Sequence, residues 1–308
     1  KAWLRHNAAC ATGVICQGIG HKSIDLVKRK RHLKVKITDK AIWQEFLKMM
    51  SIISAIFSIA FIFIDVSDKY KTCAGLLVVL FFVALYVLLW WRYNNLKHLD
   101  ILIDGSKVSV LTGDLFAQPG IKAIAFNEYF DTQVDDKIIS KNSLNGIYIN
   151  ENFKGAVAEL DQIIEDYSFE EGELIDGDVE RTGKSKKYKL GTVCLVEDYL
   201  LAALSKFDRN NKAVLTMPEY LEFLINFWDS VNRVYSQKSI SVPIFGSGIT
   251  RIKEHKNIGD EELLKIMLWT FRVSEMKFQY PAKLSVVIHK DKIDSINLLN
   301  IKAIENGI

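Results

Sequence analysis

The chain has 308 residues, of which 49% are hydrophobic and 25% are charged, and its net charge at pH 7 is +3. A net charge this close to zero excludes the strongly basic surface that nucleic-acid binding requires, so we expect no nucleic acid among the partners. A mean hydropathy of +0.09 is high for so charged a chain. It indicates that an apolar block is joined to an ordinary globular domain.

The first 42 residues are expected to form a basic cytoplasmic segment. Lys and Arg make up six of the ten residues from Val27 to Lys36. This run has two interpretations: a topology signal that holds the flank in the cytoplasm, which we favour, and a contact with anionic lipid headgroups. Residues 1–20 follow no pattern, and whether they are native stays open.

Two apolar segments within residues 43–92 predict a transmembrane helical hairpin. The second, from Cys73 to Trp91, is uncharged and as a helix would be about 28 Å long, close to the roughly 30 Å core of a bilayer. The first, from Met49 to Ile64, is shorter, and a buried core helix is its alternative. The basic flanks predict that both termini and the following domain lie in the cytoplasm.

Residues 99–308 show strand and helix patterns in alternation, which predicts an α/β domain with a mixed sheet. The first two strands are expected to turn at Asp104-Gly105. The other expected strands are residues 122–130, 188–196, 239–245 and 283–291. The expected helices are residues 153–169, 218–235, 259–273 (with Asp260 as N-cap) and 291–306.

The strand at 239–245 runs into the sequence Pro-Ile-Phe-Gly-Ser-Gly-Ile, which has two interpretations. One is a plain tight turn. The other is a phosphate cradle, because Gly246 and Gly248 let backbone N–H groups approach a diphosphate. In that case Ser247 adds a hydroxyl donor and Arg251 adds charge. Ligands of α/β sheets lie beyond the carboxyl ends of strands, and this favours the cradle.

Metal and nucleophile chemistry have no support in the sequence. The four cysteines and six histidines form no CxxC, HxxxH or HExxH pattern, and no Walker A or GxGxxG sequence occurs. We therefore expect no metal, no cofactor and no catalytic residue. Cys194 lies in an apolar run and is expected to be a buried, reduced thiol.

Three motifs in this order resemble those of macro domains, the α/β fold that binds ADP-ribose. They are Gly113-Asp114-Leu115, the strand-end Asn127, and the glycine motif at residues 243–249. Together with the hairpin, the chain resembles the membrane-anchored macro-domain effectors of bacterial Thoeris antiphage defence. That resemblance implies a non-enzymatic effector in the bacterial inner membrane. A TIR-domain partner would make its signal, an ADP-ribose derivative with an amino acid as one candidate substituent, from NAD.

The same resemblance implies that the signal drives homo-oligomerisation and disruption of the lipid bilayer, which kills or arrests the infected cell. Two alternatives stay open. One is a membrane-anchored ADP-ribosyl hydrolase. The other is a two-helix effector gated by a cyclic oligonucleotide.

The resemblance also assigns roles to residues. Asp114 would accept a hydrogen bond from the adenine amino group, the Leu115 backbone would support the base, and Asn127 and Asp131 would face the distal ribose. Without a ligand, Asp114 is a turn residue and Asn127 a strand-end cap. The full expected ligand set is Asp114, Leu115, Asn127, Asp131, Asn145, Gly146, Gly246, Ser247, Gly248, Ile249 and Arg251.

One region departs from the macro-domain pattern. A charged insertion at residues 131–142 is followed by Ser-Leu-Asn-Gly at 143–146, where catalytic macro domains have a glycine-rich phosphate loop. This departure leaves the register of the first phosphate loop open and argues against hydrolysis. The acidic residues Asp131, Asp135 and Asp136 are either solvated or positioned to meet a cationic adduct on the ligand.

Overall fold

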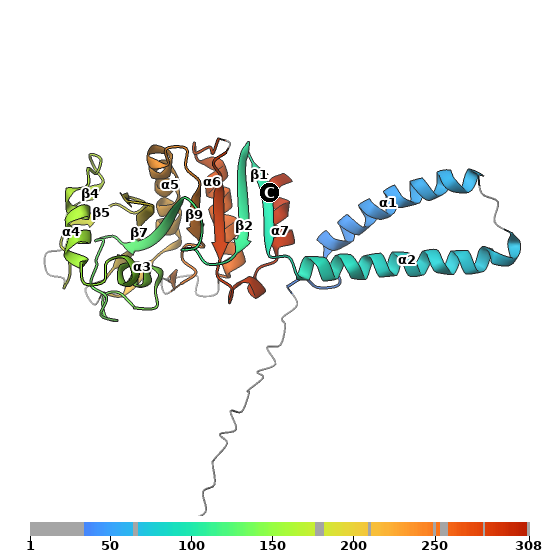
Figure 1. Cartoon of the computed structure of the whole chain (residues 1–308), viewed down its shortest axis with the longest axis horizontal. Coiled ribbons are helices and arrows are strands. Elements are labelled where there is room, and N and C mark those ends of the chain that lie inside the picture. Colours follow the sequence, from blue (N-terminus) through green and yellow to red (C-terminus); the bar gives the residue numbers. More distant parts are fainter. Residues whose placement is uncertain are drawn as a thin grey trace, which may run out of the picture. The chain divides into compact units, whose positions relative to one another are not determined.

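The computed structural model describes residues 34–63, 67–175, 182–208, 211–248, 251–252, 258–279 and 281–306. Its first two helices, α1 (Lys40–Phe63) and α2 (Asp68–Asn94), are each long and apolar enough to cross a membrane. They contact each other near the domain, where the Phe46 ring lies 5.2 Å from that of Tyr86 and 6.3 Å from that of Phe82, and they diverge away from it (Figure 1). These two helices occupy the region where the hairpin was expected.

A nine-stranded mixed sheet forms the centre of the C-terminal domain. Its order is β1-β2-β11-β9-β3-β7-β8-β10, with β6 paired to β7, and β4 and β5 form a separate pair. The neighbours β2, β11, β9, β3 and β7 are all parallel. Strand β1 runs antiparallel to β2, β6 and β8 run antiparallel to β7, and β10 is parallel to β8. The strands are β1 His98–Ile103, β2 Ser106–Thr112, β3 Ile121–Asn127, β4 Leu174–Ile175, β5 Lys187–Tyr188, β6 Val193–Val196, β7 Tyr199–Phe207, β8 Ala213–Leu215, β9 Ile240–Pro243, β10 Arg251–Ile252 and β11 Leu284–Ile288.

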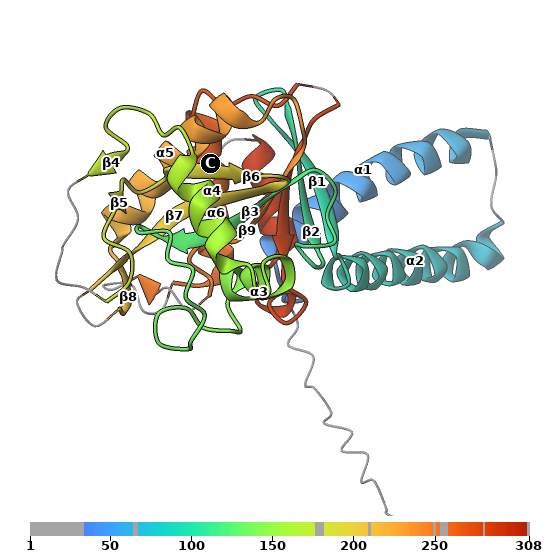
Figure 2. The same cartoon turned by 60° about the vertical axis from the view of Figure 1, so that its left-hand side comes forward.

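Helices cover both faces of this sheet because its central strands are apolar on both sides. In β3, Ile121 and Ala123 belong to one buried cluster, whereas Ile124 and Phe126 belong to the other. The first cluster includes residues of α5, α6 and α7, and the second includes α3 and α4, which lie toward the viewer in Figure 2. The helices are α3 Leu144–Asn152, α4 Val157–Asp166, α5 Met217–Val234, α6 Asp260–Val273 and α7 Leu298–Lys302, with short 3-10 helices η1 Ile293–Ser295 and η2 Ala303–Asn306.

Several local predictions are confirmed. The first two strands turn at Asp104 and Gly105, both with positive φ. Cys194 is fully buried, and burial raises the pKa of its thiol to about 12, so it is a protonated core residue. The helix expected at residues 218–235 is present as α5, Met217–Val234. It starts with a reciprocal cap that the sequence analysis did not predict, in which Thr216 Oγ1 accepts from Glu219 N and Glu219 Oε2 accepts from Thr216 N at 2.7 Å.

Other local predictions are wrong. The expected helix at residues 291–306 is broken into η1, α7 and η2, because the Asn297 side chain accepts from Leu299 N and starts a new helix. Asp260 is the first residue of α6 and not its N-cap, which is Gly259. Strand β7, at the centre of the sheet, was not predicted.

The outer edge of the sheet is the strand β1, and a side chain closes part of it. The Leu102 N–H donates to Glu305 Oε1 at 3.2 Å. Arg272 on α6 holds the neighbouring turn, since its Nη2 donates to the Ile304 carbonyl at 2.7 Å. The edge is therefore tied to the C-terminal helices.

Candidate functional site

The carboxyl ends of the five parallel strands meet at one end of the sheet, and a cavity of about 700 Å³ lies there. A crevice at this edge is where α/β sheets bind ligands. The cavity receives residues from the loops after β2, β3, β7, β9 and β11 and from the start of α3. Among the expected ligand residues, Asp114, Leu115, Asn127, Asn145, Gly246, Ser247 and Gly248 line it.

The glycine loop after β9 is fixed by a buried hydrogen bond at Phe245, and it faces open space at Gly248. Tyr220, fully buried on α5, donates its hydroxyl to the Phe245 carbonyl at 2.9 Å. Gly246 has φ +77°, a conformation that favours glycine. At Gly248 a Cβ would meet no atom of the described residues within 4 Å, so this part of the loop faces open space among them. The loop thus presents its backbone to the cavity from a fixed base.

The amino end of α3 forms the facing wall. Ser143 is the N-cap, and its Oγ accepts from Gly146 N at 3.1 Å. Gly146 is packed so tightly that a Cβ would lie 2.1 Å from the Ser140 carbonyl oxygen, and it does not line the cavity. The Ser-Leu-Asn-Gly sequence therefore starts a helix, and Asn145 lies at the amino end of a helix dipole, a place that favours anions.

The Gly113-Asp114-Leu115 step lies directly after β2. Gly113 N donates to the Ile288 carbonyl at 3.0 Å, which ties the step to the end of β11. Asp114 is exposed, and its Oδ1 accepts from Phe116 N at 3.0 Å, so the carboxylate does form the local turn. Its Oδ2 receives no hydrogen bond from any residue that the structure describes. Leu115 is 4% exposed and anchors the step in the core.

Asn127 lines the cavity, but its amide is engaged by its own loop. Its Oδ1 accepts from Tyr129 N and Asp131 N at 3.0 and 3.2 Å, and its Nδ2 donates to Asp131 Oδ2 at 2.8 Å. Asp131 is 1% exposed, accepts from Lys184 N at 2.9 Å, and lies outside the cavity lining. These two side chains shape the strand end.

Two expected residues fall outside what the structure describes. Ile249 is not described, and nothing is described of the Arg251 side chain. The cationic group that the structure does place at the glycine loop is Lys292, whose Nζ donates to the Ser247 carbonyl.

The charged insertion forms a wall of the cavity. Asp136, Lys137, Ile138 and Ile139 all line it. Asp135, which is half-buried, folds this wall by accepting from Ile138 N and Lys137 N at 2.8 and 2.9 Å, and these backbone hydrogen bonds lower the pKa of its carboxyl. Other lining residues that the sequence did not single out include Ser205, Phe207, Lys212, His289 and Lys292.

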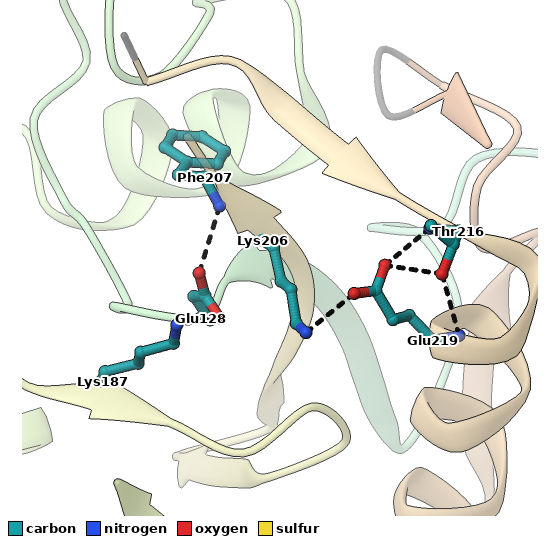
Figure 3. Close-up of polar contacts among 6 residues, drawn as sticks. All are labelled: Glu128, Lys187, Lys206, Phe207, Thr216 and Glu219. Carbon is teal, nitrogen blue, oxygen red and sulfur yellow. Dashed lines mark hydrogen bonds and ion pairs between the residues drawn. The ribbon is translucent and has the colours of Figure 1, made fainter. Parts of the chain in front are cut away.

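A polar network, shown in Figure 3, holds the end of β7 beside the cavity. Glu128 is 1% exposed, and its Oε1 accepts from Phe207 N at 3.2 Å, whereas Lys187 Nζ lies 3.4 Å from its Oε2. Burial raises the pKa of Glu128, and the Lys187 charge offsets only part of that increase. Next to it, Lys206 donates to Glu219 Oε1 at 2.8 Å, joining β7 to the first turn of α5.

Within the described residues, no group of three or more His, Cys, Asp or Glu side chains is arranged to hold a metal ion. What the cavity offers is backbone from a glycine loop, a helix amino end, an exposed carboxylate and the lysines 137, 212 and 292. Such a set suits an anionic ligand with an apolar part.

Comparison with known proteins identifies the family. Residues 108–289 match the family described as Thoeris protein ThsA, Macro domain. The Thoeris protein ThsA of Bacillus amyloliquefaciens (strain Y2) is 36% identical over 281 residues, which cover 89% of this chain and 94% of that protein. The solved structures of the Oceanobacillus iheyensis macrodomain with ADP and with MES bound are 11% and 12% identical. Both cover 69% of this chain, and 98% and 99% of their own, with TM-scores of 0.45. The chain belongs to the ThsA family of Thoeris proteins, and its α/β domain is a macro domain.

Proposed function

We propose that the cavity binds an ADP-ribose-derived nucleotide. The observation that carries this proposal is the convergence of the glycine loop, the amino end of α3 and Asp114 on one cavity at the carboxyl ends of the parallel strands. In the proposed complex the backbone around Ser247 and the start of α3 hold the diphosphate. Asp114 Oδ2 accepts from the adenine amino group, with Leu115 beside the base.

The other expected ligand residues keep more limited roles in this proposal. Asn127 and Asp131 shape the wall beside the distal ribose through their mutual hydrogen bond, and Asn145 lies next to the diphosphate. Gly146 acts through the packing of α3. Ile249 and Arg251 complete the glycine loop, the latter by adding charge.

In this proposal the chain is an antiphage defence effector. Its family membership supports a signal made from NAD by a TIR-domain enzyme. The insertion that walls the cavity at residues 136–139 would contact a group attached to the ADP-ribose, such as an amino acid. The signal would be the ligand and the TIR enzyme the partner that supplies it.

We propose binding without catalysis, although macro domains serve in both capacities. The amide of Asn127 already bonds to Asp131 and to Tyr129 N, which leaves it poorly placed to position a water molecule for attack on a distal ribose. The alternative, an ADP-ribosyl hydrolase, predicts release of free ADP-ribose from modified proteins. A time course with the purified chain distinguishes the two.

The hairpin is proposed to span the bacterial inner membrane twice, with both termini and the macro domain in the cytoplasm. Its apolar side chains support this, because they face outward on both helices: Ile56 on α1 is 62% exposed and Leu76 on α2 is 61% exposed. Ligand binding would favour a homo-oligomer in which the hairpins cluster and disrupt the bilayer. The expected result in cells is depolarisation when the TIR enzyme is active, and an intact membrane potential under that condition would exclude the mechanism.

Calorimetric titration of the detergent-solubilised chain tests the ligand. The panel contains ADP-ribose, amino-acid-linked ADP-ribose, cyclic ADP-ribose isomers and cyclic dinucleotides. Gly248→Val is the sharpest variant, because a side chain there enters open cavity space without meeting the protein. Gly155→Val is its control for effects on stability, since Gly155 has a positive φ, no neighbour within 4 Å and no place in the cavity lining.

We expect an ADP-ribose derivative to bind the parent chain and Gly155→Val, and to lose at least tenfold in affinity for Gly248→Val. Binding of cyclic dinucleotides alone would replace the proposed ligand and support the cyclic-oligonucleotide alternative. Equal affinity of both variants would remove the glycine loop from the site.

A further inference from the structure

The polypeptide that follows β11 runs from the cavity to the base of the hairpin. We propose that this segment, His289–Lys302, couples ligand binding to the hairpin, with Lys292 at its cavity end and Asn297 at its hairpin end. We refer to it below as the coupling segment. This inference rests on the proposed function, because it requires an anionic ligand at the glycine loop.

At the cavity end, one ammonium group joins the glycine loop to helix α6. Lys292 lines the cavity, and its Nζ donates to the Ser247 carbonyl and lies 3.3 Å from Asp260 Oδ1. Its side chain is 32% exposed, so a ligand in the cavity can reach it. Lys292 therefore touches the loop proposed to bind phosphate and the first residue of a core helix at the same time.

The same turn of α6 also holds the far half of the coupling segment. Glu261 accepts from Asn297 N at 2.8 Å and from Asn300 Nδ2 at 2.9 Å. Between the two ends, Ile293 is 6% exposed and Ile296 is fully buried. The segment is thus fixed to the core along its length, and a shift at Lys292 is not absorbed by a slack loop.

At the hairpin end, the segment contacts the residues that start α1. Asn297 Nδ2 donates to Asp39 Oδ2 at 3.1 Å, one residue before the helix begins. Leu299 belongs to a small buried cluster with Val35 and Ile42. Two outer ion pairs follow the same line: Asp294 with Lys34 at 3.9 Å, and Lys302 with Glu45 at 3.5 Å.

The contact reaches α2 through Val35. The Val35 carbonyl accepts from Trp90 Nε1 at 3.0 Å, and its N–H donates to Asn94 Oδ1 at 3.1 Å. Both helices of the hairpin are therefore anchored, near their domain-proximal ends, to residues that the coupling segment touches. A change in the segment alters the support of both helices.

A diphosphate at the glycine loop would compete for Lys292. A charged phosphate oxygen is a stronger acceptor for an ammonium than a peptide carbonyl is. When Lys292 turns to the ligand, it leaves the Ser247 carbonyl, and Asp260 loses its cation. Lys292 thus contacts the Ser247 carbonyl and Asp260 in the free state and the ligand in the bound state. A ligand can shift a conformational equilibrium only if it interacts differently with the two states, and this exchange of contacts meets that condition.

The test separates the hairpin end of the segment from ligand binding. In Asn297→Asp the side chain still accepts from Leu299 N but loses the donor to Asp39. Asp39→Asn keeps its bond from Ala41 N and loses the acceptor. The double variant exchanges donor and acceptor, so it restores the hydrogen bond between positions 39 and 297. The parent, the two single variants and the double variant form a double-mutant cycle.

Hydrogen exchange of residues 34–46 is measured on the full chain in lipid nanodiscs, with and without saturating ADP-ribose, and affinity is measured in parallel by calorimetry. We expect ADP-ribose to change exchange by about fivefold or more in the parent, the low end of typical allosteric coupling. The change should disappear in both single variants and return in the double variant. Affinity should vary by no more than the same factor, because coupling is reciprocal.

Lys292→Met tests the cavity end at ligand saturation. We expect it to show no change in exchange even when the site is full, which weak binding alone cannot produce. A response in the single variants equal to that of the parent would overturn the coupling while leaving the ligand proposal intact. Binding to the parent without a change at residues 34–46 would do the same. If neither ADP-ribose nor any ADP-ribose derivative of the calorimetric panel binds, the proposed function is rejected, and the coupling with it.

Discussion

The hairpin and the macro domain differ in the exposure of their apolar side chains. On α5 of the macro domain, Phe223, Phe227 and Trp228 are fully buried, whereas Leu80 in the middle of α2 is 55% exposed. The domain thus carries its stability in its own core, whereas the hairpin leaves most of its described apolar side chains uncovered. The two regions meet where Leu299 packs on Val35 and Ile42.

The largest effect on the free energy of unfolding is expected from a substitution in the core of the macro domain. Phe227→Ala is expected to lower the free energy of unfolding of the macro domain by about 3–5 kcal/mol, because it leaves a cavity in a close-packed cluster. Leu80→Ala should change the same quantity by less than about 0.5 kcal/mol. Urea unfolding followed by far-UV circular dichroism measures both, and similar losses would contradict the division.

A charge placed on α2 tests whether this helix of the hairpin spans a membrane. Leu80→Arg puts a cation near the centre of α2, which costs about 2.5–3.5 kcal/mol in a spanning helix. We expect a lower fraction of the chain to resist alkaline extraction from membranes, with unchanged unfolding of the macro domain. Leu80→Ile is the matched control. Full membrane retention of the arginine variant would argue against a spanning helix.

Two glycines of the expected ligand set, Gly248 in the cavity lining and Gly146 packed outside it, should respond differently to substitution. Gly146→Ala places a Cβ 2.1 Å from the Ser140 carbonyl oxygen and is expected to cost about 1–3 kcal/mol of stability. Gly248→Ala meets nothing within 4 Å and should stay within about 0.5 kcal/mol of the parent. Thermal unfolding compares them. Equal melting temperatures would show that α3 relaxes.

The smallest expected effect concerns pH. The pKa of Glu128 is raised in the fold, so the folded state binds its proton more tightly than the unfolded state does. Its contribution to stability is complete below the ordinary glutamate pKa and is lost as pH rises through the folded value. Glu128→Gln keeps an acceptor for Phe207 N and removes this titration. Denaturation at a series of pH values should show a flatter profile for the variant than for the parent.

The sequence predicted the parts of the fold that local chemistry decides. The two apolar runs, the Asp104-Gly105 turn and the glycine loop after β9 all depend on a few neighbouring residues. Strand β7 was missed because its sequence, Tyr-Leu-Leu-Ala-Ala-Leu-Ser-Lys-Phe, is rich in strong helix formers. Pairing with β3 on one side and β6 on the other overrides that propensity.

Only some residues of the candidate site could be predicted from the sequence. Asp114, two residues after β2, could be placed because the edge of the sheet gathers residues that follow strands. Asp131, four residues after β3, also follows a strand, yet a buried hydrogen bond turns it away from the cavity. Lys292 was missed, since only the three-dimensional path after β11 brings it to Ser247. Its place three residues beyond His289, at a strand end, was the available signal.

The hydrogen bond between Leu102 N and Glu305 Oε1 has a consequence for the proposed membrane-bound state. Confinement to a bilayer would crowd macro domains together in two dimensions, and an open sheet edge would then invite strand addition from a neighbour. Glu305 partly closes the β1 edge, and Arg272 holds the turn behind it, so strand addition at this edge would be disfavoured. Under the proposed function, crowding would then leave the ligand-free protein unassembled at this edge.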